Sequence, residues 1–304
     1  MDKPNKEIVA VTFAVDSLAL GAHWIYDTDK IRKTFGRLTT LQNPTTDSFH
    51  PNRKKGDFTP YGDQQWILLE SLIKEGGFKL KNYCLDWQVA MNNYDGYKDS
   101  ATKTTLDNLH KGLSPEDCGS PSTDLSAATR IAPLVWYYQD DLEALLSAVR
   151  GYVAMTHHSP VVLDAAQIFA RTAFDMLAGE NLLPALLTVC HHYRNSDASK
   201  LILSGLETKD MDTHKAIAFF GQSCDAELGL PGVGHLIARY NNHPKDAFIE
   251  NNMAGGESAA RGMALGLLFS ARDGMSCIDQ NWYLDLSQRY TLEKLLHFQP
   301  YEEA

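Results

Sequence analysis

Apolar side chains recur along most of the chain at spacings of three and four residues, which is the period of an amphipathic α-helix. The same period appears near residues 68–73, 142–149 and 295–298, whereas the alternation typical of β-strands is nearly absent. We count about a dozen helical segments and expect them to pack around a common centre. The pattern predicts an all-α fold. Its clearest single face consists of Val162, Ala165, Phe169, Ala173 and Met176.

Three long stretches interrupt this period and are rich in Gly, Pro, Asn, Asp and Ser, the residues that favour turns. Loops of such length without regular structure are typically functional or disordered. A basic run in the first loop, Arg53-Lys54-Lys55, is interpreted as a solvated face. No linker divides the chain, so we expect one domain over residues 1–304. The loops run from Thr39 to Asp63, from Gly112 to Asp124 and from Gly221 to Gly234.

Composition narrows the classes of function. The apolar segment at residues 8–15 is interrupted by Asp16, so we interpret it as a buried helix, and no apolar run approaches the roughly 20 residues that cross a bilayer. Lys and Arg number 28 against 38 Asp and Glu, a net charge of −10, which argues against nucleic acid as a partner. The five widely spaced cysteines include no CxxC motif, so we expect neither a disulfide framework nor a thiolate zinc site, and a cytoplasmic location.

Two motifs place acidic residues where helices are expected to begin. In YGDQQW, residues 61–66, Asp63 lies at or next to a helix N-cap, where backbone N–H groups and the helix dipole stabilise a carboxylate. In AGGESAARG, residues 254–262, two glycines allow close backbone approach and Glu257 and Ser258 begin a helix of small residues. Simple capping and a tight helix crossing are the structural alternatives to catalysis.

The histidines offer fewer constraints. Adjacent residues on a helix point about 100° apart, so neither His157-His158 nor His191-His192 can direct both rings to one metal ion. His157 lies just before Ser159-Pro160, where one helix ends and another begins, and a structural role is the simpler interpretation.

Taken in order, these segments resemble the ADP-ribosylglycohydrolase family, and within it the branch of the jellyfish J-type crystallins and selenoprotein J. VDSLALGAHWIYD is similar to the opening GDALG-like motif, with Asp16 retained and His23 in place of a glutamate. YGDQ corresponds to TDDT, so that Asp63 matches the second aspartate, and GGESAA corresponds to GGDTDT. SAATRIAPL, THHSP and GQSC supply further matches. The resemblance implies a compact ADP-ribosylglycohydrolase-like orthogonal bundle.

The resemblance also implies a central cleft that holds two Mg²⁺ ions and the ribose of an ADP-ribosyl group, carried by a protein or a small molecule. Asp63, Glu257 and Ser258 are the aligned metal ligands that remain, and because Mg²⁺ requires near-octahedral oxygen coordination we expect one weakly held ion or none. Asp63, Glu257 and His23 are the implied catalytic residues. The implied cofactor-binding residues are Asp16, Gly255, Gly256 and His157. The expected ligands are replaced by Tyr61, Gly62, Ala259 and Ala260.

Several uses of this site stay open. His23, Asp63 and Glu257 together could hold a transition metal better than Mg²⁺. Without metal, Asp63 and Glu257 could form a glycosidase carboxylate pair, with a separation of about 5–5.5 Å for retention or 6.5–9.5 Å for inversion. A crystallin-like structural or ligand-binding protein that keeps only the fold is the competing class. Because such a protein has no need of these acids, the sequence predicts a glycosidic-bond hydrolase acting on ADP-ribosyl or related ribosyl groups.

Overall fold

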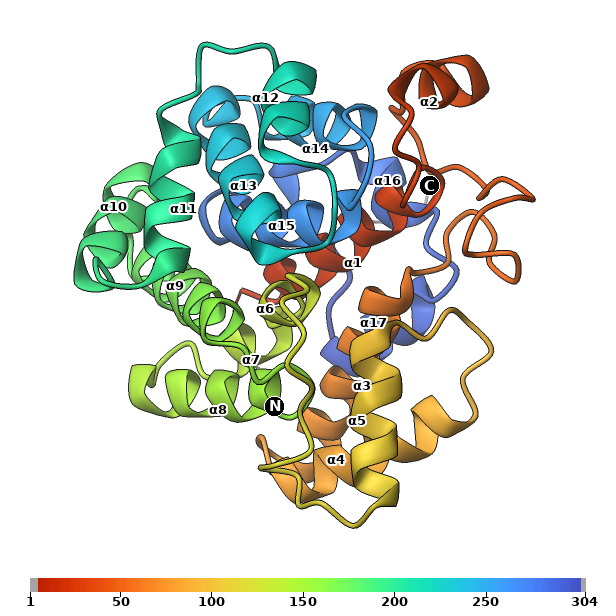
Figure 1. Ribbon diagram of the computed structural model, residues 1–304, viewed down its shortest axis with the longest axis vertical. Helices are drawn as coiled ribbons and strands as arrows, with labels where there is room; N and C mark the ends of the chain where they lie inside the picture. The colour runs from red at the N-terminus through yellow and green to blue at the C-terminus, as the bar shows by residue number, and fades with distance from the viewer. Residues whose placement is uncertain (1–4, 302–304) are drawn as a thin grey trace.

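A computed structural model describes residues 5–301, which form an all-α structure without β-strands (Figure 1). The all-α prediction is therefore confirmed. The helices are α1 (Glu7–Leu20), α2 (Thr28–Phe35), α3 (Pro60–Glu75), α4 (Leu80–Asn92), α5 (Ser100–His110), α6 (Ser126–Thr129), α7 (Ala132–Tyr137), α8 (Leu142–Ala154), α9 (Pro160–Leu177), α10 (Leu182–His192), α11 (Asp197–Leu206), α12 (Thr213–Phe220), α13 (Ala226–Tyr240), α14 (Pro244–Met253), α15 (Ser258–Asp273), the 3₁₀ helix η1 (Gly274–Cys277), α16 (Gln280–Leu284) and α17 (Arg289–Leu296).

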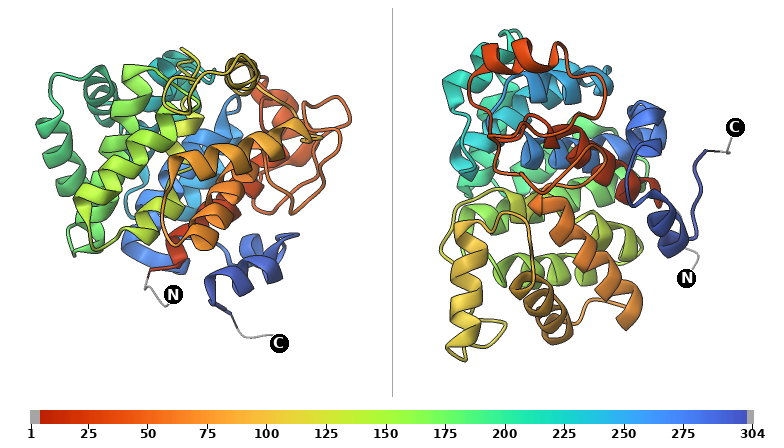
Figure 2. Two further views of the ribbon diagram at one scale, coloured as in Figure 1. Left: turned by 90° about the horizontal axis from the view of Figure 1, so that it is seen from below. Right: turned by 90° about the vertical axis from the view of Figure 1, so that its right-hand side faces the viewer.

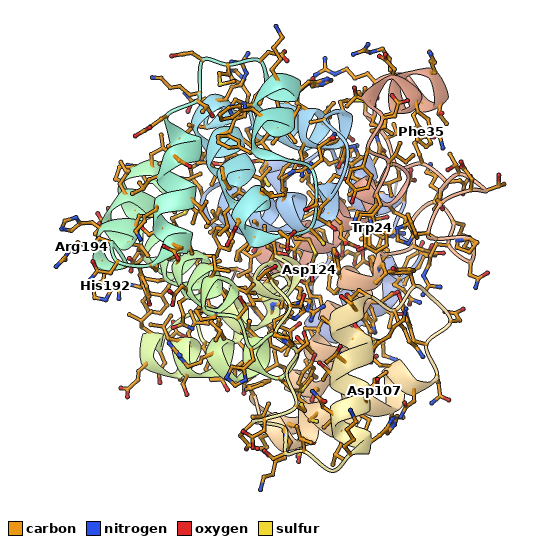
Figure 3. All side chains as sticks on the ribbon, viewed as in Figure 1. Trp24, Phe35, Asp107, Asp124, His192 and Arg194 are labelled. Atoms are coloured by element: carbon orange, nitrogen blue, oxygen red, sulfur yellow. The ribbon has the colours of Figure 1, made fainter. Side chains whose placement is uncertain are left out.

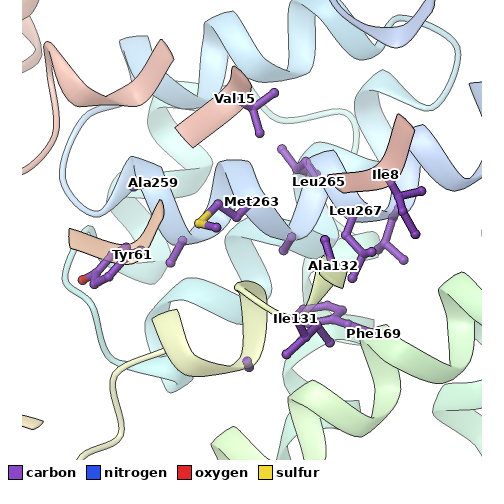
Figure 4. Close-up of a cluster of buried hydrophobic side chains, with 14 of the residues drawn as sticks. Ile8, Val15, Tyr61, Ile131, Ala132, Phe169, Ala259, Met263, Leu265 and Leu267 are labelled. Atoms are coloured by element: carbon purple, nitrogen blue, oxygen red, sulfur yellow. The ribbon is translucent and has the colours of Figure 1, made fainter. Parts of the chain in front are cut away.

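Helices α1 and α15 form the centre of the molecule and pack against each other. Every residue of α1 from Ile8 to Leu20 is buried, as expected for the apolar segment near the N-terminus. Gly266 on α15 permits the close crossing, because a Cβ there would lie 2.7 Å from the side chain of Val15. Figure 4 shows apolar side chains of α15 lining the cluster on this side, among them Met263 and Leu265.

Several helices pack directly on this pair, and the others pack on those. α3, α7 and α14 contact α1, while α9, α13 and α14 contact α15. The predicted apolar face of α9 is confirmed, because all five of its residues are buried. Figure 2 shows the segment from α2 to the start of α3 running along one side of the molecule. One hydrophobic cluster extends from Ile8 to Leu296, although the single domain itself stays a prediction. No helix within residues 5–301 has both the length and the hydropathy that crossing a membrane requires.

Two predicted loop boundaries are wrong. The first loop ends earlier, because Thr59 caps α3 and Asp63 lies inside its first turn rather than at the cap. The third loop gives way to α13 at Ala226, and this helix contains Pro231. Its glycines serve packing instead of turning: a Cβ at Gly234 would overlap the carbonyl oxygen of Ile202 in α11. The glycines that predicted a loop here are therefore needed for a close helix crossing.

The Gly234→Ala variant tests this crossing. We expect it to lower the free energy of unfolding by about 1–3 kcal/mol, the usual cost of overpacking, although Ala is favoured over Gly in helices by about 1 kcal/mol. A backbone carbonyl cannot rotate away as a side chain can. The matched control is Gly151→Ala in α8, where the added Cβ would lie 3.4 Å from Phe78 and should be neutral or stabilising. Urea unfolding measures both, and equal stability of Gly234→Ala and the parent would contradict the close crossing.

Candidate functional site

The carboxylate of Glu257 is the anchor of the site. Glu257 is the N-cap of α15, as its motif predicts, and its Oε1 accepts hydrogen bonds from the backbone N–H of Ala260 at 3.1 Å and pairs with Nε2 of His23 at 2.8 Å. Its Oε2 accepts from the indole of Trp24 at 2.6 Å and the hydroxyl of Tyr61 at 2.9 Å. Burial opposes ionisation, but the charge and hydrogen bond of His23 and the other donors outweigh it and lower the pKa of Glu257.

His23 joins this carboxylate to a second imidazole. Its Nδ1 lies 3.0 Å from Nε2 of His50, and both rings are buried. Burial, reinforced by the charge of His23, lowers the pKa of His50 to about 3, so His50 is neutral at physiological pH. The two nitrogens of His23 therefore connect a neutral imidazole to a buried carboxylate, and this fixes the orientation of the His23 ring.

Trp24 closes one side of the site. Its backbone has a φ of 65°, which is uncommon for a bulky residue and is held by the hydrogen bond from its N–H to the carbonyl of Gly256 at 3.0 Å. Its ring stacks on His23 at 4.2 Å and contacts Phe49 and Tyr97 edge-on. Trp24, Phe49 and Tyr97 form what we call the aromatic cover, of which Phe49 is 51% exposed.

Asp124 is the second carboxyl group at this position. Its Oδ2 lies 3.4 Å from the Tyr61 hydroxyl, which also bonds Glu257, and its Oδ1 accepts from the N–H of Ser126 at 2.8 Å. Burial and the charge of Glu257 raise the pKa of Asp124, opposite to the shift of Glu257. In Figure 3 Asp124 and Trp24 both lie near the middle of the view. The sequence signal for Asp124 is modest: it is an acid at the end of a long turn-rich loop.

Asp63 lies in a separate set of contacts. Its Oδ2 accepts hydrogen bonds from Nη2 of Arg53 at 3.0 Å and from the hydroxyl of Tyr94 at 2.5 Å. Burial raises the pKa of Asp63, and Arg53 opposes this rise. The interpretation of the basic run as a solvated face is wrong for Arg53, whose side chain is 13% exposed, because this loop folds back on the start of α3. Asp63 therefore does not bond to Glu257, and the carboxylate pair of these two residues, one of the uses that the sequence left open, is not formed by direct contact.

Asp16 is used inside the fold. It is completely buried, and its two oxygens accept hydrogen bonds from the hydroxyl and the N–H of Thr59 at 2.5 and 2.8 Å, which ties α1 to the cap of α3. A Cβ at Gly62 would overlap Oδ2 of Asp16, so this position has no room for the aspartate that the motif leads one to expect. Asp16 senses the charges of both Asp63 and Glu257. Asp16, Asp63 and Glu257 therefore lie near one another, as the motifs predict, but Asp16 is enclosed in the packed interior and does not line an open cleft.

The other predicted positions differ in their surroundings. Gly255 and Gly256 have φ of 74° and 68°, and a Cβ on either would meet the protein's own backbone at Ile25 or Gln222. The Oγ of Ser258 is buried without a hydrogen-bond partner. Next to Thr156, the ring of His157 is buried, its Nδ1 lies 3.0 Å from the threonine Oγ1, and burial lowers its pKa.

These contacts do not fit the two Mg²⁺ ions that the resemblance implies. Both oxygens of Glu257 are already bonded, to four groups in total, and Oδ2 of Asp63 accepts from a guanidinium and a phenol. Only Oδ1 of Asp63 and the Oγ of Ser258 carry no hydrogen bond, and two oxygens fall short of the ligands that a pair of Mg²⁺ ions requires. Among residues 5–301 no three His, Cys, Asp or Glu side chains are grouped to hold a metal ion. A transition metal on His23, Asp63 and Glu257 meets the same obstacle, because Asp63 bonds elsewhere.

Comparison with known proteins agrees with the fold and the motifs. Residues 12–302 match the family model described as ADP-ribosylglycohydrolase. Crystallin J1A of Tripedalia cystophora is 21% identical over 294 residues, with 91% of this chain and 90% of the relative covered, and crystallin J1B of the same organism is 22% identical over 297 residues with the same coverage. A solved structure titled ADP-ribosylglycohydrolase-related protein complex superposes with a TM-score of 0.73 at 20% identity, covering 96% of this chain and 95% of that one.

The Asp16→Asn variant tests the burial of this carboxyl group. Burial raises the pKa of Asp16 from 3.8 to about 7, so its contribution to stability is fully present below the unfolded pKa and is lost as pH rises through the folded pKa. Between these two values the free energy of unfolding of the parent should fall relative to Asp16→Asn, by at most about 1.4 kcal/mol per pH unit. Urea unfolding across this range, with the exposed Asp29→Asn as control, measures it. A pH-independent difference between parent and Asp16→Asn would contradict the assignment.

Proposed function

Because the chain belongs to the ADP-ribosylglycohydrolase family, we propose that it hydrolyses the N- or O-glycosidic bond of an ADP-ribosyl or related ribosyl group without a metal ion. The observation that carries this proposal is the pair of Asp124 and Glu257, which contact one Tyr61 hydroxyl and have pKa values shifted in opposite directions. Glycosidases that use two carboxyl groups need one protonated and one ionised.

The opposite shifts assign the roles. Asp124, with its raised pKa, gives its proton to the leaving nitrogen or oxygen as the glycosidic bond breaks, while a Glu257 oxygen bonds to the anomeric carbon. Water then breaks this ester bond, and its proton passes to the Asp124 carboxylate. The Tyr61 hydroxyl supports this retaining course. It lies 3.4 Å from an oxygen of Asp124 and 2.9 Å from an oxygen of Glu257, so these two oxygens lie closer together than the roughly 6.5 Å that is the smallest carboxyl separation of inverting enzymes.

The residues around Glu257 hold it in place for this role. His23 and Trp24 fix its two oxygens, and His50 in turn fixes the ring of His23. Glu257 is 1% exposed, so a substrate reaches it only when the aromatic cover is displaced. Phe49 and Tyr97 belong to loops and are themselves partly exposed, which makes them the part of the cover that can move at least cost.

Two conservative variants test the carboxyl pair. Asp124→Asn and Glu257→Gln should each lower kcat on the order of 10² or more, the usual contribution of a positioned acid or base, because the amide keeps the shape but cannot exchange the proton or attack. His191→Ala is the control, since His191 is exposed at the end of α10, and neighbouring His192 lies at the edge of the molecule in Figure 3. Release of ADP-ribose from N- and O-linked substrates is measured in the presence of a metal chelator. Full activity of both carboxyl variants would contradict the proposal.

The crystallin-like alternative is favoured by a different observation: both oxygens of Glu257 are saturated by protein donors and the residue is buried. In a purely structural protein Glu257→Gln would break a buried hydrogen-bonded pair at a cost of about 3–5 kcal/mol. The parent would then release no ADP-ribose from any substrate of the panel, and the variant would differ from it in stability alone. ADP-ribose release and stability, both measured on the parent and on Glu257→Gln, therefore separate the two functions.

A further inference from the structure

Arg53 lies in a loop, yet its side chain is only 13% exposed and makes several specific contacts. Its Nη2 donates to Asp63 at 3.0 Å and its Nη1 donates to Asp95 at 3.0 Å, while its guanidinium lies 5.2 Å from the centre of the Tyr94 ring. The loop is tied down beside it, because the side-chain amide of Asn52 donates to the carbonyl oxygen of Asp95. Arg53 therefore links the loop before α3 to α3 itself through Asp63, and to the loop after α4 through Asp95.

Asp63 needs such a cation. Burial disfavours its ionised form, and the nearby charge of Asp57 disfavours it further, whereas Arg53 and the Tyr94 hydroxyl stabilise it. A carboxylate that loses its water is costly to the fold unless a counter-charge and hydrogen bonds replace the water. The planar guanidinium supplies both, with a donor for each of the two carboxylates.

We propose that Arg53 is a built-in counter-cation that takes, at Asp63, the place a divalent metal ion would otherwise have, and that its removal creates a divalent-cation site between Asp63 and Asp95. The inference does not depend on hydrolysis. It follows from the mismatch between the donors around Asp63 and a metal site: one oxygen of each carboxylate bonds to a different nitrogen of the same guanidinium, so the side chain of Arg53 occupies the space between Asp63 and Asp95.

Three variants and a matched control test it by thermal unfolding of the full chain, with MgCl₂ or CaCl₂ against NaCl of equal ionic strength. Arg53→Ala should melt below the parent in chelator and recover on the order of 2 °C or more with divalent ion, since a ligand that binds only the folded state raises Tm. The parent and Arg53→Lys, which keeps the charge, should not respond. Arg53→Ala/Asp63→Asn should lose the recovery, because one of the two ligands is gone.

Arg37 provides the matched control. It also bridges two carboxylates, Asp246 and Glu250, and these are about as exposed as Asp63 and Asp95. The side chain of Arg37 itself is 55% exposed, against 13% for Arg53, so its removal leaves an open surface that water fills, and Arg37→Ala should show no specific response to divalent ions. A specific divalent response of the parent would overturn the proposal, as would an Arg53→Ala protein that folds and gives none. Should Arg53→Ala fail to fold in chelator, the proposal requires that Mg²⁺ or Ca²⁺ restore folding, measured by circular dichroism, and no restoration would overturn it.

Discussion

The structure depends on the burial of one ionised carboxylate. Glu257 is almost completely removed from water, and a charge in that position is tolerated only when donors replace the lost hydration. Those donors come from the turn after α1, the first turn of α3 and the start of α15, so three parts of the chain that are far apart in sequence must meet at one point. The left-handed backbone of Trp24 is one consequence, because that conformation accompanies the hydrogen bond of its indole to Glu257.

Local pattern and long-range contact explain what the sequence could and could not predict. The helical period of α9 and the capping position of Glu257 are set by residues within a few positions of one another, and both are confirmed. The helical Pro231 was missed because the glycines around it reflect contacts with distant segments, such as that of Gly234 with α11, which composition does not reveal. Asp124 and His50 were missed for the same reason: each gains its importance from a partner at least 27 positions away.

The contacts of Asp16 show why the residues of one motif restrict the residues of the next. Thr59 occupies both of its oxygens and also caps α3 through its own hydroxyl, so this pair fixes where the helix begins. Gly62 then has to lie against Asp16, and a larger residue there would disrupt the pair. The lost aspartate in the YGDQ segment is thus a steric consequence of how α1 meets α3, and Arg53 neutralises the one aspartate that remains.

Asp63, Glu257 and Asp124 are stabilised in three different ways. Asp63 has a guanidinium and Glu257 has His23 and neutral donors, whereas Asp124 has no cation within hydrogen-bond distance to offset burial and the charge of Glu257, which raise its pKa. If all three were neutralised by fixed cations, none would exchange a proton near neutral pH. Of the two acids that contact the Tyr61 hydroxyl, Asp124 is therefore the one that can exchange a proton, beside a Glu257 that stays ionised, and that asymmetry is the property an acid–base pair requires.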